Sequence, residues 1–115
     1  FDKSSLQAIE KAILAANLGF NPKNEGEFLR IPVPPLTEER RKDLAKRSKT
    51  VAEETKVGIR NIRRNANDDA KKLKDEGVSE DEVKLVTDKI QELTDKYVKK
   101  IDELCELKVK DILTV

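Results

Sequence analysis

The sequence predicts a mostly α-helical α+β protein, in which two long helices form an antiparallel hairpin beside part of a small α/β domain. Three observations support this fold class. Charged residues make up 41% of the 115 residues and aromatic residues only 3%, which suits long amphipathic helices better than a thick globular core. Apolar residues recur at three- and four-residue steps over two long stretches. Pro34 and Pro35 separate these stretches from a shorter N-terminal unit.

The N-terminal unit is predicted to contain one helix and one short strand. Ser4 and Gln7 form a capping-box pattern ahead of a helical apolar repeat, and Gly19 is the expected terminator of that helix. Residues 28–33, with the sequence FLRIPV, alternate like a strand whose prolines confine it to a sheet edge. One helix and one strand cannot close a sheet, so we expect further strands outside this chain.

The two long helices are predicted from their caps as well as from their apolar repeat. Thr37 is the expected N-cap of the first helix, which runs to about Asp75. Gly77 should end this helix, and Ser79 with Glu82 forms a second capping box that starts the next one. A link this short makes the two helices antiparallel neighbours.

Two helices bury little of such long apolar stripes, so a third helix is expected to complete a bundle. That helix could come from a preceding segment, from a partner or from self-association, and a preceding segment is the simplest source. The chain contains no methionine, even at position 1, which we interpret as the mark of a processed or incomplete piece.

Basic residues are concentrated on one side of the first long helix, although the chain has 24 Lys and Arg against 23 Asp and Glu. At about 100° per residue, this side lies roughly 120° from the side that carries Ile59, Ile62 and Ala66. Only one acid, Asp68, is spaced to pair with any of its arginines. We call this set the basic stripe; it consists of Lys42, Lys46, Lys49, Lys56, Arg60, Arg63, Arg64, Asn67 and Lys71.

The basic stripe has two interpretations. A charged helix side is most often only solvated. Scarce acidic partners, and arginine where the stripe is densest, favour a contact with phosphate groups, because the planar guanidinium binds phosphate in a bidentate manner. The stripe lacks aromatic residues for base stacking, so structured RNA recognised by its shape and backbone fits better than single-stranded RNA.

Other kinds of site are excluded or disfavoured. The chain has no histidine, which excludes histidine-based catalysis and zinc clusters. The single cysteine, Cys105, lies in an apolar step of the last helix and is interpreted as a core thiol. No nucleotide-binding motif and no apolar run long enough to span a membrane are present. We therefore expect no enzymatic activity, no cofactor, no metal and no membrane association.

Several segments together resemble the ribosome recycling factor family. They are FDKSSLQAIEKAI, LGFNPKNEGEFLRIPVP, PPLTEERRKDLAK, IRNIRRNAND and TDKYVKKIDEL, in the same order and spacing as in the family. The resemblance covers the whole chain. It implies a three-helix bundle joined by two hinge strands to a small β/α/β domain. Residues 1–33 then belong to the small domain, 34–36 to the hinge and 37–115 to two helices of the bundle.

The resemblance also implies function and partners. A recycling factor binds the large ribosomal subunit, with its 23S-type rRNA, after termination, and elongation factor G with GTP then splits the ribosome into subunits. Arg60 and Arg63 match the family's rRNA-contacting arginines, with Arg64 as their neighbour, and Lys56 and Asn67 share their stripe. Asn65 departs from the aspartate expected there, which removes a negative charge beside the arginines. The hinge residues that match are Val33, Pro34 and Pro35.

A monomer in the bacterial cytoplasm is the expected state of the complete protein, with a plastid or the mitochondrial matrix as the alternative location. A second hypothesis is a coiled-coil assembly or adaptor protein that does not bind RNA. The apolar steps drift from a strict heptad, and this hypothesis leaves the proline-bounded N-terminal unit without a role.

Overall fold

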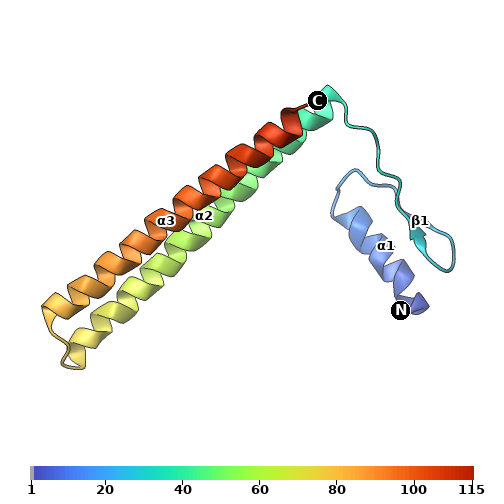
Figure 1. Ribbon diagram of the computed structural model, residues 1–115. Coiled ribbons are helices and arrows are strands. Elements are labelled where there is room, and N and C mark those ends of the chain that lie inside the picture. Colours follow the sequence, from blue (N-terminus) through green and yellow to red (C-terminus); the bar gives the residue numbers. More distant parts are fainter. Residues whose placement is uncertain (1) are drawn as a thin grey trace. The chain divides into compact units, whose positions relative to one another are not determined.

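The computed structural model describes residues 2–115 and divides into two compact units, Phe1–Leu36 and Thr37–Val115 (Figure 1). The first unit begins with a short 3₁₀ helix η1 (Lys3–Ser5) that leads directly into α1 (Leu6–Ala15). A carboxylate oxygen of Asp2 accepts hydrogen bonds from the Ser4 amide at 2.9 Å and the Ser4 hydroxyl at 2.6 Å. These bonds hold the pKa of the Asp2 carboxyl below its ordinary value.

The expected capping box at Ser4 and Gln7 is therefore wrong. Asp2 caps the 3₁₀ turn, and the N-cap residue of α1, Ser5, makes no capping hydrogen bond with its side chain. The 3₁₀ turn moves the first capped amide ahead of the α-helix, which a pattern search for α-helical caps does not anticipate. The far end of α1 also differs, because the helix stops at Ala15 and Asn17 is the first residue with a positive φ, ahead of Gly19.

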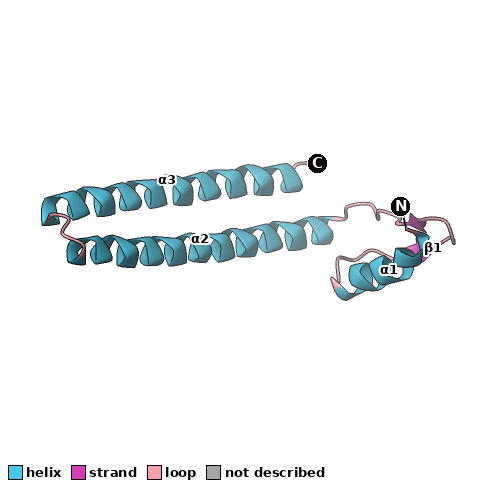
Figure 2. Cartoon of the chain, turned by 90° about the horizontal axis from the view of Figure 1, so that it is seen from below, coloured by secondary structure: helices cyan, strands magenta, loops and turns pink. Residues whose placement is uncertain are grey.

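The sheet of the first unit has two short strands, β1 (Lys23–Asn24) and β2 (Leu29–Arg30), which pair antiparallel (Figure 2). Lys23 lies opposite Arg30, and the turn between the strands contains Gly26 at a φ of 87°. The predicted strand over residues 28–33 is thus confirmed only at Leu29 and Arg30, and β1 was not predicted. The prolines at 32, 34 and 35 exclude a longer ladder beyond β2, because they lack an amide hydrogen.

The second unit consists of α2 (Glu38–Asp75) and α3 (Glu80–Leu113), which lie side by side as an antiparallel hairpin (Figures 1 and 2). The hydroxyl of Thr37 accepts a hydrogen bond from the Arg40 amide at 3.1 Å and caps α2, as the sequence predicts. The mostly helical α+β fold class and the long-helix hairpin are confirmed.

The link between the two helices is held by local hydrogen bonds. The Val78 amide donates to the Leu73 carbonyl at 3.1 Å and the Gly77 amide to the Lys74 carbonyl at 3.2 Å, which together form a Schellman motif. Ser79 and Glu82 then form the predicted capping box at the start of α3. Gly77 has a φ of 94°, in the left-handed region that glycine adopts without a steric penalty.

Two glycines of the hairpin should respond to alanine in opposite directions. Gly77→Ala is expected to lower the free energy of unfolding by about 1–2 kcal/mol, since a Cβ there meets no neighbouring atom but the backbone is left-handed. Gly58→Ala, in the interior of α2, is expected to raise it by about 0.5–1 kcal/mol, because open space surrounds its Cβ and alanine favours the helix. Urea denaturation of both variants tests this, and a shift in the same direction for both would contradict it.

Small side chains form the contact between α2 and α3. Ala45 and Ala70 of α2 are 6% and 3% exposed, and Thr94 of α3 is 8% exposed. The Thr94 hydroxyl donates a hydrogen bond to the Ile90 carbonyl at 2.8 Å, so its burial leaves no unpaired donor. Close approach at these small residues brings the long side chains of neighbouring positions into contact across the pair of helices.

The end of the hairpin away from the link is held by Arg41. Its Nη1 atom donates hydrogen bonds to the carbonyls of Ile112 at 2.7 Å and Thr114 at 3.0 Å. These carbonyls lie at the C-terminus of α3, where the helix has no further amides to satisfy them. Arg41 therefore ties the start of α2 to the end of α3 and caps α3 with a positive charge.

One side of the hairpin is an apolar groove of about 380 Å³. Its lining includes Ile62, Leu93 and Tyr97, which are 68%, 44% and 47% exposed. An exposed apolar groove of this kind is what an incomplete helical bundle presents. A third helix that covers it remains a prediction.

Candidate nucleic-acid interface

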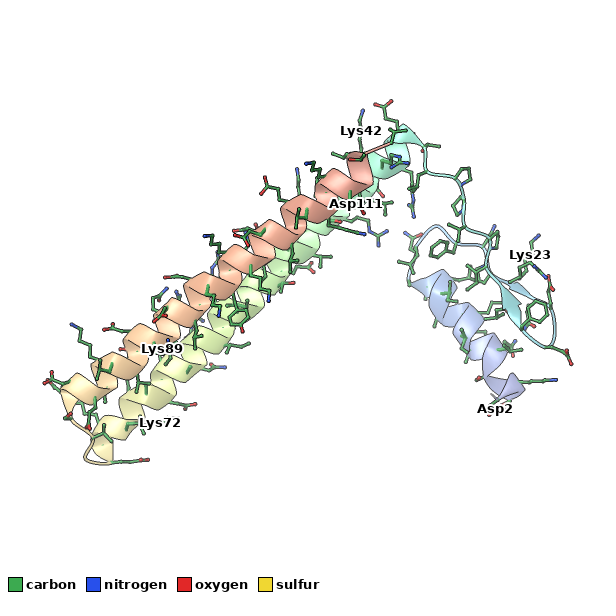
Figure 3. The ribbon with its side chains drawn as sticks, in the orientation of Figure 1. Asp2, Lys23, Lys42, Lys72, Lys89 and Asp111 are labelled. Carbon is green, nitrogen blue, oxygen red and sulfur yellow. The ribbon has the colours of Figure 1, made fainter. Side chains whose placement is uncertain are left out.

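Arg60 and Arg64 are not part of the lining of the apolar groove, whereas Arg63 is. Ile62 lines the groove, Ala70 faces α3, and the exposed Arg64 lies on a third side when residues are counted at about 100° each. Charged side chains project along the length of both helices (Figure 3). The placement of Ile62 and Arg64 on different sides of α2 agrees with the sequence analysis, but Arg63, predicted to lie on the basic side, is half-buried and lines the groove.

Arg60 and Arg64 are exposed, and neither forms an ion pair or hydrogen bond with any side chain among residues 2–115. The pairing that the sequence allowed between Arg64 and Asp68 is not formed in the structure. Three further exposed members of the basic stripe also have no ion-pair partner within the described chain: Lys46, Lys49 and Lys71. Their hydrogen-bond donors are available for an anionic ligand.

Arg63 is placed differently from its two neighbours. It is half-buried between α2 and α3, and its Nη1 atom donates a hydrogen bond to the side-chain carbonyl of Gln91 at 3.4 Å. The Gln91 amide nitrogen in turn donates to the carboxylate of Asp95 at 2.8 Å. A single neutral partner leaves the charge of Arg63 uncompensated.

Lys56 does not lie on the outer surface with the other basic residues, so its placement on the basic stripe is wrong. Its side chain is only 11% exposed, and its ammonium group lies 2.8 Å from the Asp102 carboxylate and 2.7 Å from that of Glu53. Asp102 belongs to α3, so this pair joins the two helices. Lys56 is about 40° from Arg60 around the helix, and that rotation is enough to turn it toward α3.

The carboxylates of Asp102 and Glu53, in that order of influence, raise the pKa of the Lys56 ammonium group. A raised pKa in the folded state means that the ion pair stabilises the hairpin below the ordinary lysine pKa of about 10.4, and that this contribution is lost as the pH rises through the folded value. We expect the free energy of unfolding to fall more steeply above about pH 10 in the wild type than in Lys56→Met.

Urea denaturation of both proteins across this window measures the difference, with a reference measurement near neutral pH. Lys56→Met keeps the aliphatic stem between the helices and removes only the charge, which makes it the matched variant. Parallel curves for the two proteins would show that Lys56 does not contribute to the alkaline loss of stability.

Asn67 lies at the border between the basic stripe and the helix contact. It is half-buried, and its Oδ1 atom is buried without a hydrogen-bond partner among the described residues. Arg60 and Arg64 are thus exposed, Arg63 lines the apolar groove, Asn67 is half-buried, and Lys56 is held by two carboxylates.

The position of Cys105 agrees with the sequence analysis. Cys105 is half-buried, and its thiol lies 3.8 Å from the Ser48 carbonyl on α2, as expected of a thiol in the helix contact. Within residues 2–115, no three His, Cys, Asp or Glu side chains gather in a way that could hold a metal ion. In the same range, no helix is both long enough and apolar enough to cross a membrane.

Sequence reasoning missed two α3 residues, Gln91, which accepts a hydrogen bond from Arg63, and Asp95, which accepts one from Gln91. Their spacing of four residues places both on one side of α3, which was a usable signal. Assigning them to Arg63 needed the register between the two antiparallel helices, which no local pattern supplies.

Comparisons with known proteins give one consistent result. A family model described as ribosome recycling factor matches residues 1–113. The chain is 58% identical to the ribosome-recycling factor of Flavobacterium johnsoniae over 115 residues and 56% identical to that of Staphylococcus carnosus over 116 residues. It is 53% identical to that of Halalkalibacterium halodurans over 116 residues. Each alignment covers all of this chain but only 62–63% of the relative.

Proposed function

The chain belongs to the ribosome recycling factor family, and we propose that its protein binds the large ribosomal subunit after termination and helps to split the ribosome into subunits. The contact with 23S-type rRNA is made by Arg60, Arg63 and Arg64, with Asn67 at its edge. Lys56 is left out of this surface because its ammonium group is occupied by two carboxylates.

The observation that carries the proposal is the lack of acidic partners for Arg60 and Arg64. Exposed arginines on a protein surface commonly pair with acids three or four residues away, and the chain is rich in acids. Both arginines nevertheless present free guanidinium groups on one side of a rigid helix. Guanidinium groups in this state bind phosphate without first giving up an ion pair.

The second part of the proposed function concerns elongation factor G. We propose that this factor, using GTP, moves the recycling factor on the ribosome and that residues 34–36 act as a hinge between its two parts. Residues 31–36 are exposed and lack regular secondary structure, and the Val33 side chain is 78% exposed. Pro34 and Pro35 limit the orientations of such a segment because their φ angles are restricted.

Co-sedimentation with purified large ribosomal subunits tests the binding, in a full-length protein that contains this chain and over a series of salt concentrations. We expect binding that weakens steeply with salt, because displaced counterions supply much of the free energy. A light-scattering assay with elongation factor G and GTP then tests the splitting of ribosomes. A protein that neither pellets nor splits ribosomes would contradict the proposal.

The alternative of a coiled-coil adaptor without RNA binding rests on the exposed apolar groove beside Ile62, Leu93 and Tyr97. It predicts a stable dimer or higher oligomer of the full-length protein. The proposed function predicts a monomer in the bacterial cytoplasm. Sedimentation equilibrium without ribosomes distinguishes the two.

A further inference from the structure

We infer that Gln91 and Asp95 of α3 are positioning residues for Arg63. Gln91 orients the Arg63 side chain through a hydrogen bond from a neutral amide, so the positive charge of Arg63 remains available to bind a phosphate group. This inference rests on the proposed function, because it assigns the way in which one arginine of the proposed surface is presented. It concerns residues from the neighbouring helix that do not themselves belong to the basic stripe.

A chain of two hydrogen bonds links Arg63 to Gln91 and Gln91 to Asp95. Arg63 donates to the Gln91 carbonyl oxygen at 3.4 Å, and the Gln91 amide nitrogen donates to Asp95 at 2.8 Å. If the amide were turned over, its nitrogen would face the guanidinium donors and its oxygen would face the carboxylate, and both contacts would be repulsive. Asp95 therefore selects the orientation of Gln91 that can hold Arg63.

The partner of Arg63 is a neutral amide, and this decides how much of the guanidinium stays available. A guanidinium group has five N–H donors, and a single bond to an amide oxygen occupies one of them without neutralising the charge. A carboxylate in the same place would form a bidentate ion pair and occupy the edge that binds phosphate. Asp95 lies one amide group away and forms no ion pair with Arg63 within the described chain. Gln91 thus holds the arginine and also separates it from the nearby acid.

Arg63 differs from Arg60 and Arg64 in its burial. Arg60 and Arg64 are exposed, so their side chains are free to reorient toward a ligand. Arg63 is half-buried, lines the groove between α2 and α3 and donates a hydrogen bond to Gln91, so its guanidinium is less free to reorient. An arginine that is already positioned loses less side-chain conformational entropy when it binds. The hydrogen bond to Gln91 therefore favours phosphate binding by Arg63.

The test compares Gln91→Glu with Gln91→Ala in a full-length protein that contains this chain. Gln91→Glu is expected to weaken binding to large ribosomal subunits by about tenfold, close to the effect of Arg63→Ala, because a carboxylate then occupies the guanidinium. The slope of log affinity against log salt should fall by about 1, as for the loss of one phosphate contact. Gln91→Ala should weaken binding less and leave that slope unchanged, because the charge of Arg63 is kept.

Leu85→Glu is the matched control, since it adds the same negative charge at a position on α3 that is 70% exposed and about 120° from Gln91. It should change binding much less than Gln91→Glu. In an Arg63→Ala background, Gln91→Glu should have no further effect. Thermal unfolding verifies that each variant is folded, and a purely structural role of Gln91 would lower the melting temperature without this dependence on Arg63.

The outcomes separate the two proposals. If Arg63→Ala weakens binding but Gln91→Glu does not, the positioning role is overturned and the proposed surface stands. If Gln91→Glu weakens binding equally with and without Arg63, the effect does not pass through Arg63 and the inference is again wrong. If neither Arg60→Ala nor Arg63→Ala changes binding, the proposed surface fails, and the positioning role fails with it.

Discussion

Replacing Arg60 and Arg63 together with alanine is expected to weaken binding to large ribosomal subunits by about 100-fold, since each charge-assisted contact contributes roughly tenfold. The slope of log affinity against log salt should fall by about 2, one unit for each lost phosphate contact. The melting temperature should stay close to that of the wild type, because Arg60 is exposed and Arg63 forms no ion pair among residues 2–115, only a hydrogen bond to the neutral Gln91. Co-sedimentation across a salt series and thermal unfolding measure these quantities.

A double variant that removes the same charge elsewhere is the control for this experiment. Lys99→Ala/Lys110→Ala removes two exposed cations from α3, away from the basic stripe. It should leave most of the affinity and of the salt dependence intact. Equal losses for the two double variants would mean that net charge, and not the arginine surface, drives binding.

The second large effect is expected at Ile62, which lines the apolar groove and is 68% exposed in this chain. If a third helix covers the groove in a full-length protein, Ile62→Asp buries an unpaired carboxylate. The free energy of unfolding should then fall on the order of 3 kcal/mol. Binding to ribosomal subunits should be largely preserved in whatever fraction remains folded, because Ile62 is not one of the proposed contact residues, even though Arg63 lines the same groove.

Val57→Asp is the matched control, because Val57 is also a β-branched residue of α2 and is 51% exposed. It does not line the groove, so the same substitution should change the stability by less than about 0.5 kcal/mol, as at an ordinary surface position. Urea denaturation of both variants provides the comparison. If both are tolerated equally, the groove is open in the full-length protein and the third-helix prediction is wrong.

Local patterns predicted the elements of the second unit well. The helix ends lie where the sequence predicts them, with N-caps at Thr37 and Ser79 and a Schellman motif at Gly77. These ends are predictable because a cap depends on hydrogen bonds between residues at most five positions apart. The first unit was predicted less well. The 3₁₀ turn at Lys3–Ser5 and the two-residue strand β1 are too short to produce a periodic signal.

The candidate site was only partly predictable. The grouping of Arg60, Arg63 and Arg64 follows from helical periodicity, and their role in binding rRNA remains a proposal. Lys56 was misplaced, although it lies only about 40° from Arg60 around the helix. Periodicity does not show where along that arc the neighbouring helix begins to cover the surface.

The sequence by itself determined the two long helices, their ends, and the separation of Arg60 and Arg64 from the apolar side of α2, because all of these depend on residues within a few helical turns. Only the tertiary structure decided which charged side chains have an ion-pair or hydrogen-bond partner on the other helix. Lys56 donates a hydrogen bond to the carboxylate of Asp102, 46 positions later, and Arg63 donates one to the side-chain carbonyl of Gln91, 28 positions later. Both contacts depend on the register of one antiparallel helix against the other. That register is a property of packing between distant segments, and small residues such as Ala45 and Ala70 allow the close approach that establishes it.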